Sequence, residues 1–342
     1  MSAGYTVAIV GATGAVGTTL LRVLEERKFP VRELRCFASA RSAGKTVTYR
    51  GEAIRVEPLG ASVFRGVELA LFSAGGARSL EFAPQAVAAG AIVIDNSSAF
   101  RQDPAVPLVV PEINAHAARE HRGLLAVPNC TTIVMVMALK PLHDAARVRR
   151  VVVTSFQAVS GAGAQAVEEL KAQTMAWARG EPMAVRVFPH RIAFNVLPHI
   201  DAFLETGYTK EEMKLQNETR KILEASAMRV SATTVRVPVF TAHSVSVHAE
   251  TDRKVTAAEA RDLFSRFPGL RLWDDPGENR YPMPILAEGQ DDCLVGRIRE
   301  DCSLDSGLAF WVVGDQLRKG AATNAVQIAE LVAGDGRGRG SP

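Results

Sequence analysis

A single cysteine stands at the point where an apolar strand is followed by an apolar helix. Cys130 lies in the stretch LLAVPNCTTIVMVMAL, residues 124–139, directly after Asn129. A thiol in the first turn of a helix is stabilised as a thiolate by the helix dipole and by free N–H groups, so it can act as a nucleophile. The same position also suits a small buried hydrophobe. From this stretch alone, a reactive cysteine and an inert packing cysteine both remain open.

A thiolate nucleophile needs an acid or a base close to it. Histidine suits that task because its ordinary pKa lies near neutrality. The chain has seven histidines, at positions 116, 121, 143, 190, 199, 243 and 248. Position in the sequence does not choose among them.

A glycine-rich turn near the N-terminus is typical of dinucleotide binding. In VAIVGATGAVG the glycines follow a buried strand and open a helix, where backbone N–H groups can approach a pyrophosphate. The spacing is G-x-x-G-x-x-G rather than the more usual G-x-G-x-x-G, and a strand–helix turn without a ligand is the alternative. The cofactor-binding residues predicted here are Gly11, Ala12, Thr13, Gly14, Ala15, Val16 and Gly17.

The loop after the second expected strand favours NADP over NAD. Where an NAD ribose would bind a carboxylate, the chain reads FASARSAGK. Ser39, Arg41 and Ser42 can hold a 2′-phosphate, which a carboxylate would repel. A solvated loop carrying Arg41 and Lys45 is the alternative.

The elements around these residues change character along the chain. Up to about residue 130, short strands alternate with helices: YTVAIV, a helix over residues 15–27, LRCFA, VELALF, a helix near residues 79–89, and AIVID. After residue 147 the strands VRRVVVTSF, SATTVRVPV, HSVSVHAE, CLVGRIRE and LAFWVVG follow, several with polar–apolar alternation. We therefore predict an α/β protein, with a Rossmann-type doubly wound parallel sheet and a second α+β domain with a mainly antiparallel sheet.

The last expected helix, about residues 320–332, could return to the first domain, and GDGRGRGSP after it is expected to be a disordered tail. The predicted domains are residues 1–130 with 319–342, binding NADP, and residues 131–318, for catalysis and dimerisation.

Composition excludes several classes of protein. The 342 residues carry 40 basic and 37 acidic side chains without long basic runs, which argues against a nucleic-acid partner. The four cysteines form no C-x-x-C pair, so neither a disulfide framework nor a metal site is predicted, and a reducing cytoplasm is the expected compartment. We interpret Cys36, Cys293 and Cys302 as packing residues. The N-terminus lacks the features of a signal peptide, and the longest uncharged run, residues 123–139, is shorter than the ~20 residues that span a bilayer.

Ten blocks of the sequence together resemble one enzyme family, the bacterial aspartate-β-semialdehyde dehydrogenases. They occur in the family's order and approximate spacing from about residue 5 to residue 331: GATGAVG, SARSAGK, LFSAGG, DNSSAFR, VPNCTT, QAVSGAG, EEMKLQNETRKIL, RVPVFTAHS, VGRIRED and WVVGDQLRKGAATNAVQIAE. Singly, several blocks are unspecific, but ten in order are specific.

The resemblance implies a reaction. NADPH would reduce L-aspartyl-4-phosphate to aspartate 4-semialdehyde and phosphate through a cysteine thioester, in the biosynthesis of lysine, diaminopimelate, threonine and methionine. The implied substrates are aspartyl-4-phosphate, aspartate semialdehyde and phosphate. The family also suggests a homodimer formed through the second domain's sheet, with a tetramer left open.

The resemblance also implies roles for individual residues. Cys130 would be the nucleophile, His243 the acid/base, and Gln157 the residue that orients substrate; a surface strand histidine is the alternative for His243. Arg236 would bind the substrate carboxylate and Glu211 its amino group. Lys214, three residues after Glu211 on one helical face, and Arg101 would bind phosphate. Further cofactor contacts would come from Ser73, Ala74, Gly75, Ser160, Gly161 and Asn324.

Two residues depart from the family pattern. Phe156 stands where tyrosine is often found, which should alter packing beside Gln157. Thr323 stands where tryptophan is common, which should loosen the wall of the cofactor pocket.

Rival functions remain. N-acetyl-γ-glutamyl-phosphate reductase shares the glycine turn and the cysteine chemistry, but its acetylated amine would not pair with a carboxylate such as Glu211. A catalytically silent nucleotide-binding paralogue should have lost its reacting groups, whereas all are present here. A cysteine hydrolase built on Cys130 and His243 would leave the glycine turn unexplained.

Overall fold

The computed structural model describes residues 4–334 and divides the chain into two compact units. Unit 1 comprises Met1–Asn129 with Ala321–Pro342, and unit 2 comprises Cys130–Gly320. The expected disordered tail after Gly334 lies outside the described residues. Among residues 4–334, none of the helices combines the length and the hydropathy that crossing a bilayer requires.

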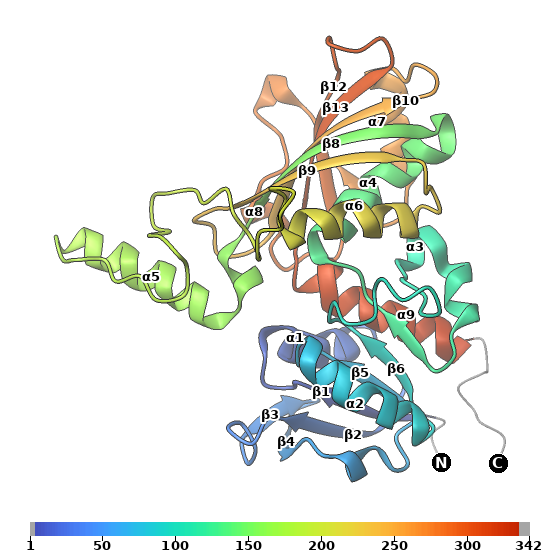
Figure 1. Cartoon of the computed structure of the whole chain (residues 1–342), viewed down its shortest axis with the longest axis vertical. Coiled ribbons are helices and arrows are strands. Elements are labelled where there is room, and N and C mark those ends of the chain that lie inside the picture. Colours follow the sequence, from blue (N-terminus) through green and yellow to red (C-terminus); the bar gives the residue numbers. More distant parts are fainter. Residues whose placement is uncertain (1–3, 335–342) are drawn as a thin grey trace. The chain divides into compact units, whose positions relative to one another are not determined.

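Unit 1 is built on a seven-stranded sheet in the order β3-β4-β2-β1-β5-β6-β7 (Figure 1). Its strands are β1 (Tyr5–Val10), β2 (Val31–Ala38), β3 (Thr46–Tyr49), β4 (Glu52–Pro58), β5 (Leu69–Phe72), β6 (Ile92–Asp95) and β7 (Leu124–Ala126). Every neighbouring pair is parallel except β3–β4. The strands of the central part are buried on both faces, as their unbroken apolar runs predict.

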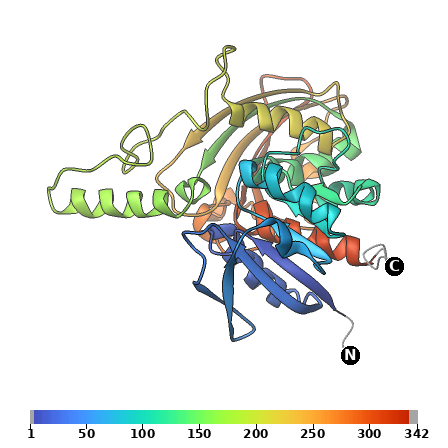
Figure 2. The ribbon, with the colours of Figure 1, turned by 60° about the horizontal axis from the view of Figure 1, so that its bottom comes forward.

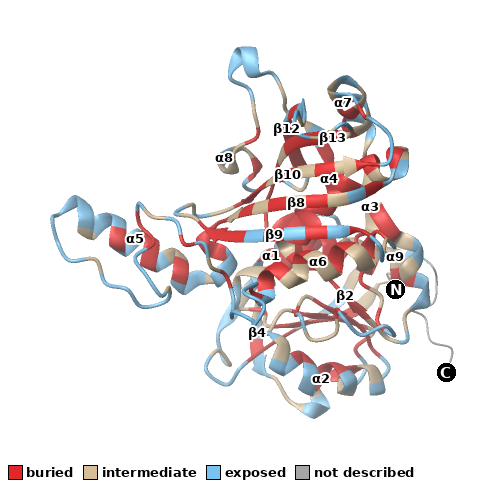
Figure 3. Cartoon of the chain, turned by 45° about the horizontal axis from the view of Figure 1, so that its top comes forward, coloured by how far each residue is buried: buried red, intermediate tan, exposed pale blue. Residues whose placement is uncertain are grey.

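Helices cover both faces of this sheet, which is the doubly wound arrangement. The helices of unit 1 are α1 (Ala15–Glu26), α2 (Gly76–Ala88), α3 (Pro111–Asn114) and α9 (Thr323–Gly334), with the 3₁₀ turns η1 (Ala61–Phe64) and η2 (Ala115–Glu120). Figure 3 shows α1 and α9 on one side of the sheet and α2 on the other. Arg27 after α1 makes a bidentate pair with Glu330 of α9 at 2.7 and 2.8 Å. The last helix therefore packs in unit 1.

The turn from β1 into α1 depends on two of its three glycines. Gly11 has φ +91°, and a Cβ there would stand 2.7 Å from the Ser73 carbonyl oxygen. A Cβ at Gly17 would stand 2.2 Å from the Gly11 carbonyl oxygen, so only glycine lets the helix approach the turn so closely. Gly14 is the residue before α1, and a Cβ there would be 3.3 Å from the same oxygen. The spacing therefore has a steric reason even before a ligand is considered.

Unit 2 is built on a six-stranded, mainly antiparallel sheet in the order β11-β12-β13-β10-β8-β9. Its strands are β8 (Val148–Gln157), β9 (Arg229–Arg236), β10 (His243–Thr251), β11 (Leu270–Leu272), β12 (Cys293–Glu300) and β13 (Gly307–Gly314). The pairs β8–β10, β10–β13 and β12–β13 are antiparallel, and β8–β9 and β11–β12 are parallel. Together the two sheets confirm the predicted fold class.

One face of the second sheet is covered by helices. The helices of unit 2 are α4 (Cys130–Ala146), α5 (Ala164–Ala178), α6 (Lys210–Ile222), α7 (Ala257–Arg266) and α8 (Pro284–Ala287), with the turns η3 (Val159–Ala162), η4 (Pro276–Glu278) and the π-helical η5 (Arg318–Ala322). Helix α4 packs against β8, β10 and β13, and α6 packs against β9. The other face carries the partly exposed Phe156 and Trp311, whose ring centroids lie 5.3 Å apart.

An arm formed by α5 and residues 179–208 extends from the rest of unit 2 (Figures 1 and 2). Glu169 and Gln173 of α5 hold the returning chain by accepting hydrogen bonds from backbone N–H groups of Val187 and Ile192. The arm nevertheless leaves large apolar side chains in contact with water: Met175, Trp177, Val185, Val187, Phe194, Val196, Phe203, Leu204 and Tyr208 are all exposed.

Two expectations need correction, and one hairpin was not predicted. Cys302 is exposed in the turn after β12, so it is not a packing residue, whereas Cys36 and Cys293 are buried as expected. Phe156 does not pack beside Gln157, because successive strand side chains point to opposite faces and Phe156 packs on Trp311. The β3–β4 hairpin was not foreseen, since its largely exposed residues lack a clear apolar pattern.

Candidate functional site

Cys130 is the first residue of α4, as its position after Asn129 predicted. The helix behind it is buried along most of its length, so its axis is fixed against the sheet. The thiol is only partly buried. Gly320 lies directly over it, because a Cβ at that glycine would stand 2.9 Å from the Cβ of Cys130. The sulfur therefore sits at a helix N-terminus, where a thiolate is stabilised.

His243 is the first residue of β10 and is fully buried, so the surface alternative is wrong. Burial, together with the positive charge of Arg236, lowers the pKa of His243 to about 3. Its Nδ1 accepts a hydrogen bond of 3.1 Å from the Ala158 N–H. A neutral imidazole whose Nδ1 accepts must carry its proton on Nε2. That Nε2 has no hydrogen-bond partner among residues 4–334, so its proton is available to a ligand.

The glycine-rich turn after β8 lies against the histidine. A Cβ on Gly161 would stand 3.1 Å from Nε2 of His243 and 3.0 Å from Nη1 of Arg236. A side chain at this position would therefore occupy the space in front of both groups. The SGAG turn, which was expected to contact the cofactor, thus lies beside His243 and Arg236 within unit 2.

Arg236 ends β9 and is almost fully buried. Its Nη1 donates a 2.7 Å hydrogen bond to the Ala158 carbonyl oxygen. Burial lowers the pKa of Arg236, while the negative charges of Glu211 and Cys130 act in the opposite direction. A guanidinium stays protonated in any case. Arg236 thus lies within electrostatic range of the thiol and of Glu211.

Glu211 and Lys214 lie three residues apart on one face of α6. The first turn of this helix is fixed by a capping box between Thr209 and Glu212. Lys214 Nζ donates to Glu211 Oε2 at 3.0 Å, and Gln157 Nε2 donates to Glu211 Oε1 at 3.2 Å. The expected i, i+3 pair is therefore present and buried on the carboxylate side. These contacts join α6 to the end of β8.

Gln316 and Asp201 are two residues that sequence reasoning missed. Gln316, in the loop after β13, accepts from the Ala242 N–H at 2.7 Å and donates to Ser160 Oγ at 2.5 Å. Ala242 has φ +68°, so Gln316 holds the residue before His243 in an unfavourable conformation. Asp201 accepts from Lys214 Nζ at 2.7 Å. The DQLRKG block could have indicated Gln316, but no pattern marked Asp201.

The cofactor residues predicted from the first half of the chain lie in unit 1. Ser39, Arg41 and Ser42 form the turn after β2, in which the Ser42 N–H donates to the Ser39 carbonyl oxygen at 2.8 Å, and Arg41 is exposed. Ser73, Ala74 and Gly75 lie between β5 and α2, and open space surrounds a Cβ position on Gly75. Both loops follow the carboxyl ends of parallel strands, where doubly wound sheets bind nucleotides.

Arg101 and Asn324 also belong to unit 1, and both are buried. Arg101 Nη2 donates to the Asn96 carbonyl oxygen at 2.8 Å. Its loop is fixed by Asp95, which accepts from the hydroxyls of Ser79 and Ser97 at 2.7 and 2.6 Å. Asn324 donates to the Val109 carbonyl oxygen at 2.8 Å, so its amide has a structural partner, and Thr323 beside it is buried.

Comparison with known proteins points to one family. Residues 6–121 match the model described as semialdehyde dehydrogenase, NAD binding domain, and residues 139–319 match semialdehyde dehydrogenase, dimerisation domain. The aspartate-semialdehyde dehydrogenase of Aquifex aeolicus is 56% identical over 97% of this chain and 99% of its own length. Crystal structures of aspartate semialdehyde dehydrogenase II from Vibrio cholerae, one of them complexed with ASA, share 48% identity and a TM-score of 0.95. They cover 97% and 98% of this chain and 99% of their own.

The lowered pKa of His243 predicts how stability depends on pH. In the unfolded chain histidine has a pKa of about 6.5, whereas here it is about 3. Between these pH values the unfolded chain binds a proton at residue 243 that the folded protein does not bind. The free energy of unfolding is therefore unaffected by this histidine above pH 6.5 and decreases as the pH falls from 6.5 toward 3. His243→Gln should flatten the decline by up to about 1.4 kcal/mol per pH unit.

Urea unfolding between pH 4 and 7.5 measures this slope. His190→Gln, at an exposed site of the arm, is the matched control and should keep the wild-type slope. Equal slopes for all three proteins would contradict burial of a neutral His243.

Proposed function

The chain belongs to the aspartate-semialdehyde dehydrogenase family, and from this premise we propose that it reduces L-aspartyl-4-phosphate to L-aspartate 4-semialdehyde and phosphate with NADPH. The observation that carries the proposal is the grouping in unit 2 of a helix-terminal thiol, a neutral buried histidine and side chains of both charges. The substrate has an ammonium, a carboxylate and a phosphate, so it requires both charges. The reaction places the enzyme in amino-acid biosynthesis leading to lysine, diaminopimelate, threonine and methionine.

Cys130 forms and releases the covalent intermediate. Its thiolate attacks the acyl carbon, the carbon–oxygen bond to phosphate breaks, and phosphate leaves with the bonding electrons. NADPH, held by the glycine turn of residues 11–17 and the loops after β2 and β5, would supply the hydride that reduces the thioester. The carbon–sulfur bond of the resulting thiohemiacetal then breaks, which yields the aldehyde and restores the thiolate. The partly buried position of Cys130 at the start of α4 suits both attack and departure.

His243 stabilises the negative charge that develops on the substrate oxygen. Because its Nδ1 accepts from Ala158, its Nε2–H is the group presented to the reacting oxygen, and it donates a hydrogen bond to that oxygen while the thiohemiacetal forms and collapses. Burial keeps the ring neutral, so His243 adds no positive charge beside Arg236. Gln157, bonded to Glu211, orients the acyl group.

Each charged group of the substrate is bound by a different charged residue. Arg236 binds the α-carboxylate through its planar guanidinium, and Glu211 binds the α-ammonium. Lys214 and Arg101 bind the phosphate. An N-acetylated substrate has a neutral amide in place of the ammonium. The buried carboxylate of Glu211 would then face a group without a positive charge, which is unfavourable. This disfavours N-acetyl-γ-glutamyl-phosphate reduction, and a silent paralogue is disfavoured because every reacting side chain is present.

Residues 1–130 and 319–342 form the NADP-binding domain of the proposal, and residues 131–318 the catalytic and dimerisation domain. The cradle fits the cofactor: Gly11 and Gly17 admit no Cβ, and a Cβ on Gly75 would point into open space. The pyrophosphate would lie on residues 11–17 at the start of α1, and the 2′-phosphate on Ser39, Arg41 and Ser42. Ser73 to Gly75, Ser160, Gly161 and Asn324 would complete the cofactor site.

The covalent mechanism predicts the behaviour of Cys130→Ala. The variant should lose turnover in both directions but keep NADPH binding, because only the acyl carrier is removed. The assay is phosphate-dependent reduction of NADP with aspartate semialdehyde, with NADPH binding followed by fluorescence. Cys302→Ala, at an exposed site, is the control and should retain full activity. Residual turnover by Cys130→Ala would refute a thioester, and preference for the N-acetylglutamyl substrate would refute the substrate assignment.

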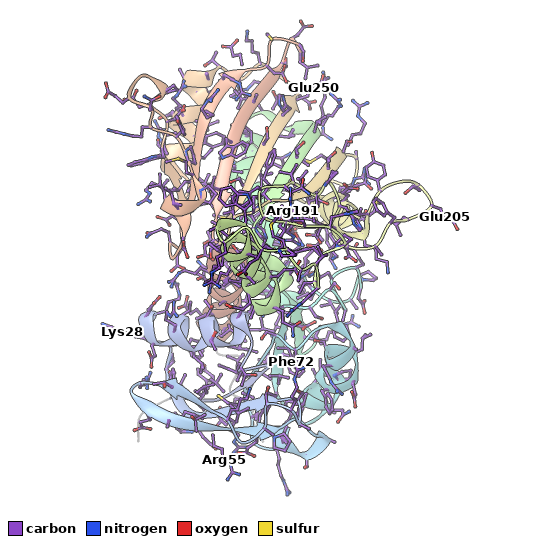
Figure 4. The ribbon with its side chains drawn as sticks, turned by 90° about the vertical axis from the view of Figure 1, so that its left-hand side faces the viewer. Lys28, Arg55, Phe72, Arg191, Glu205 and Glu250 are labelled. Carbon is purple, nitrogen blue, oxygen red and sulfur yellow. The ribbon has the colours of Figure 1, made fainter. Side chains whose placement is uncertain are left out.

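The proposed 2′-phosphate site predicts a change in cofactor preference. Arg41→Ala should raise KM for NADP by about tenfold while leaving KM for NAD nearly unchanged, since one charge-assisted contact is worth about 1.5 kcal/mol. Steady-state kinetics with both cofactors measure the ratio. Arg55→Ala, another arginine of unit 1 on β4 (labelled in Figure 4), serves as the control. A parallel rise of both KM values would contradict a phosphate contact.

The homodimer is proposed to bury the arm and the uncovered face of the second sheet. Trp177 and Phe194 are 59% and 56% exposed, with ring centroids 4.6 Å apart, and water-exposed apolar clusters of this kind mark interfaces. Trp177→Asp should shift the protein from dimer toward monomer in sedimentation velocity. Leu80→Asp, at a similarly exposed leucine of α2, should remain dimeric. A monomeric wild type, or a dimeric Trp177→Asp, would overturn this assignment.

A further inference from the structure

The ammonium of Lys214 is held by two carboxylates at once. Its Nζ lies 2.7 Å from Asp201 Oδ2 and 3.0 Å from Glu211 Oε2. Burial disfavours the charges, but the charge of Glu211 and the hydrogen bonds to both carboxylates outweigh it, so the pKa of Lys214 is raised. The pKa of Asp201 is lowered because the hydrogen bonds from Lys214 and the Ala202 N–H outweigh its burial. Lys214 is therefore a cation paired with two carboxylates.

The position of Asp201 is fixed by the backbone around it. Leu197 exchanges two hydrogen bonds of 2.8 and 2.9 Å with Arg236, and the Lys210 N–H donates to the Ala202 carbonyl oxygen at 2.9 Å. The chain between these contacts therefore returns to α6. Asp201 itself has φ +68°, and its Oδ1 accepts from the Ala202 N–H at 2.8 Å. This conformation directs its other carboxylate oxygen to Lys214.

The two carboxylates differ in exposure and in the role open to them. The Glu211 side chain is 7% exposed and also contacts Gln157, whereas that of Asp201 is 34% exposed. In the proposed function Glu211 is needed for the substrate ammonium. A phosphate that binds Lys214 must therefore take the place of Asp201, or share the cation with it against like-charge repulsion.

On the basis of the proposed function, we propose that Asp201 competes with the substrate phosphate for Lys214 and keeps phosphate binding weak enough for rapid release. Asp201 holds the lysine oriented before substrate arrives. When the acyl–phosphate bond has broken, the carboxylate recaptures the ammonium and the free phosphate dissociates. Asp201 is thus a positioning and specificity residue that acts through Lys214 without touching the acyl group.

Asp201→Asn tests the proposal with little disturbance of the fold. Asparagine tolerates a positive φ and keeps an oxygen for the Ala202 N–H, but it lacks the charge. The variant should lower KM for phosphate in the aldehyde-oxidising direction by about threefold to tenfold, the usual range for an interaction between partly exposed charges. Inhibition by phosphate in the reductive direction should strengthen by the same factor, and KM for aspartate semialdehyde should stay within about twofold.

Glu205→Gln is the matched control, because it removes one negative charge from the same segment. Glu205 is exposed, and Figure 4 shows it at the tip of the loop, directed away from the rest of unit 2. This variant should keep the wild-type KM for phosphate. A general effect of net charge on anion binding would instead shift both variants equally and would overturn the role of Asp201.

Titration calorimetry with inorganic phosphate separates this inference from the proposed function. If wild type lacks phosphate-dependent NADP reduction, the proposed function fails, while the calorimetric comparison still tests Asp201. Tighter phosphate binding by Asp201→Asn than by wild type and Glu205→Gln supports competition. Unchanged or weaker binding by Asp201→Asn overturns it, since a residue that only orients Lys214 would lose affinity when altered. A structurally damaged site would not bind phosphate more tightly.

Discussion

The geometry of the site in unit 2 depends on one residue whose side chain takes no part in it. The N–H of Ala158 donates to Nδ1 of His243, and its carbonyl oxygen accepts from Nη1 of Arg236. A single residue of the main chain thus fixes the tautomer of His243 and the direction of the Arg236 guanidinium. Because β8 pairs with both β9 and β10, the same strand also brings these side chains to adjacent positions. The relative positions of His243 and Arg236 therefore depend on the register of β8 with its two neighbouring strands.

Burial of so much charge in one place is tolerated because the charges compensate one another. Arg236, Glu211 and Lys214 are each partly or wholly removed from water, and isolated ions there would be costly. Gln157 donates to the Glu211 carboxylate and Arg236 donates to the Ala158 carbonyl oxygen, so both buried charges also have a neutral hydrogen-bond partner. His243 is neutral, so it does not add a third positive charge to those of Arg236 and Lys214. The result is a buried group of both charges in which each charged side chain has a partner of opposite charge or a hydrogen-bond acceptor.

Sequence reasoning reached the fold class and the element that carries the thiol, because these depend on local patterns. Strand periodicity, the glycine turn and the start of α4 at Cys130 are each encoded within about ten residues. The choice of His243 among seven histidines was not local, and it came from resemblance. Asp201 and Gln316 were missed because their roles arise only when residues far apart in the chain meet, at Lys214 and at Ala242. Cys302 was misread because an exposed turn after a strand has the same local composition as a strand end.

Ala158 acts through its main-chain N–H and carbonyl oxygen only, and this determines which substitutions at position 158 would disturb the site. Replacing its methyl group with another small side chain would leave both hydrogen bonds in place. Such a substitution would therefore have little effect on activity in a mutational scan. Only a change that removes the N–H or moves the strand would register, as with an imino acid. Because Ala158 is fully buried, a larger side chain would not fit without moving the strand, so only small residues preserve the alignment of His243 and Arg236. A comparison of residues by the roles of their side chains alone would miss this position.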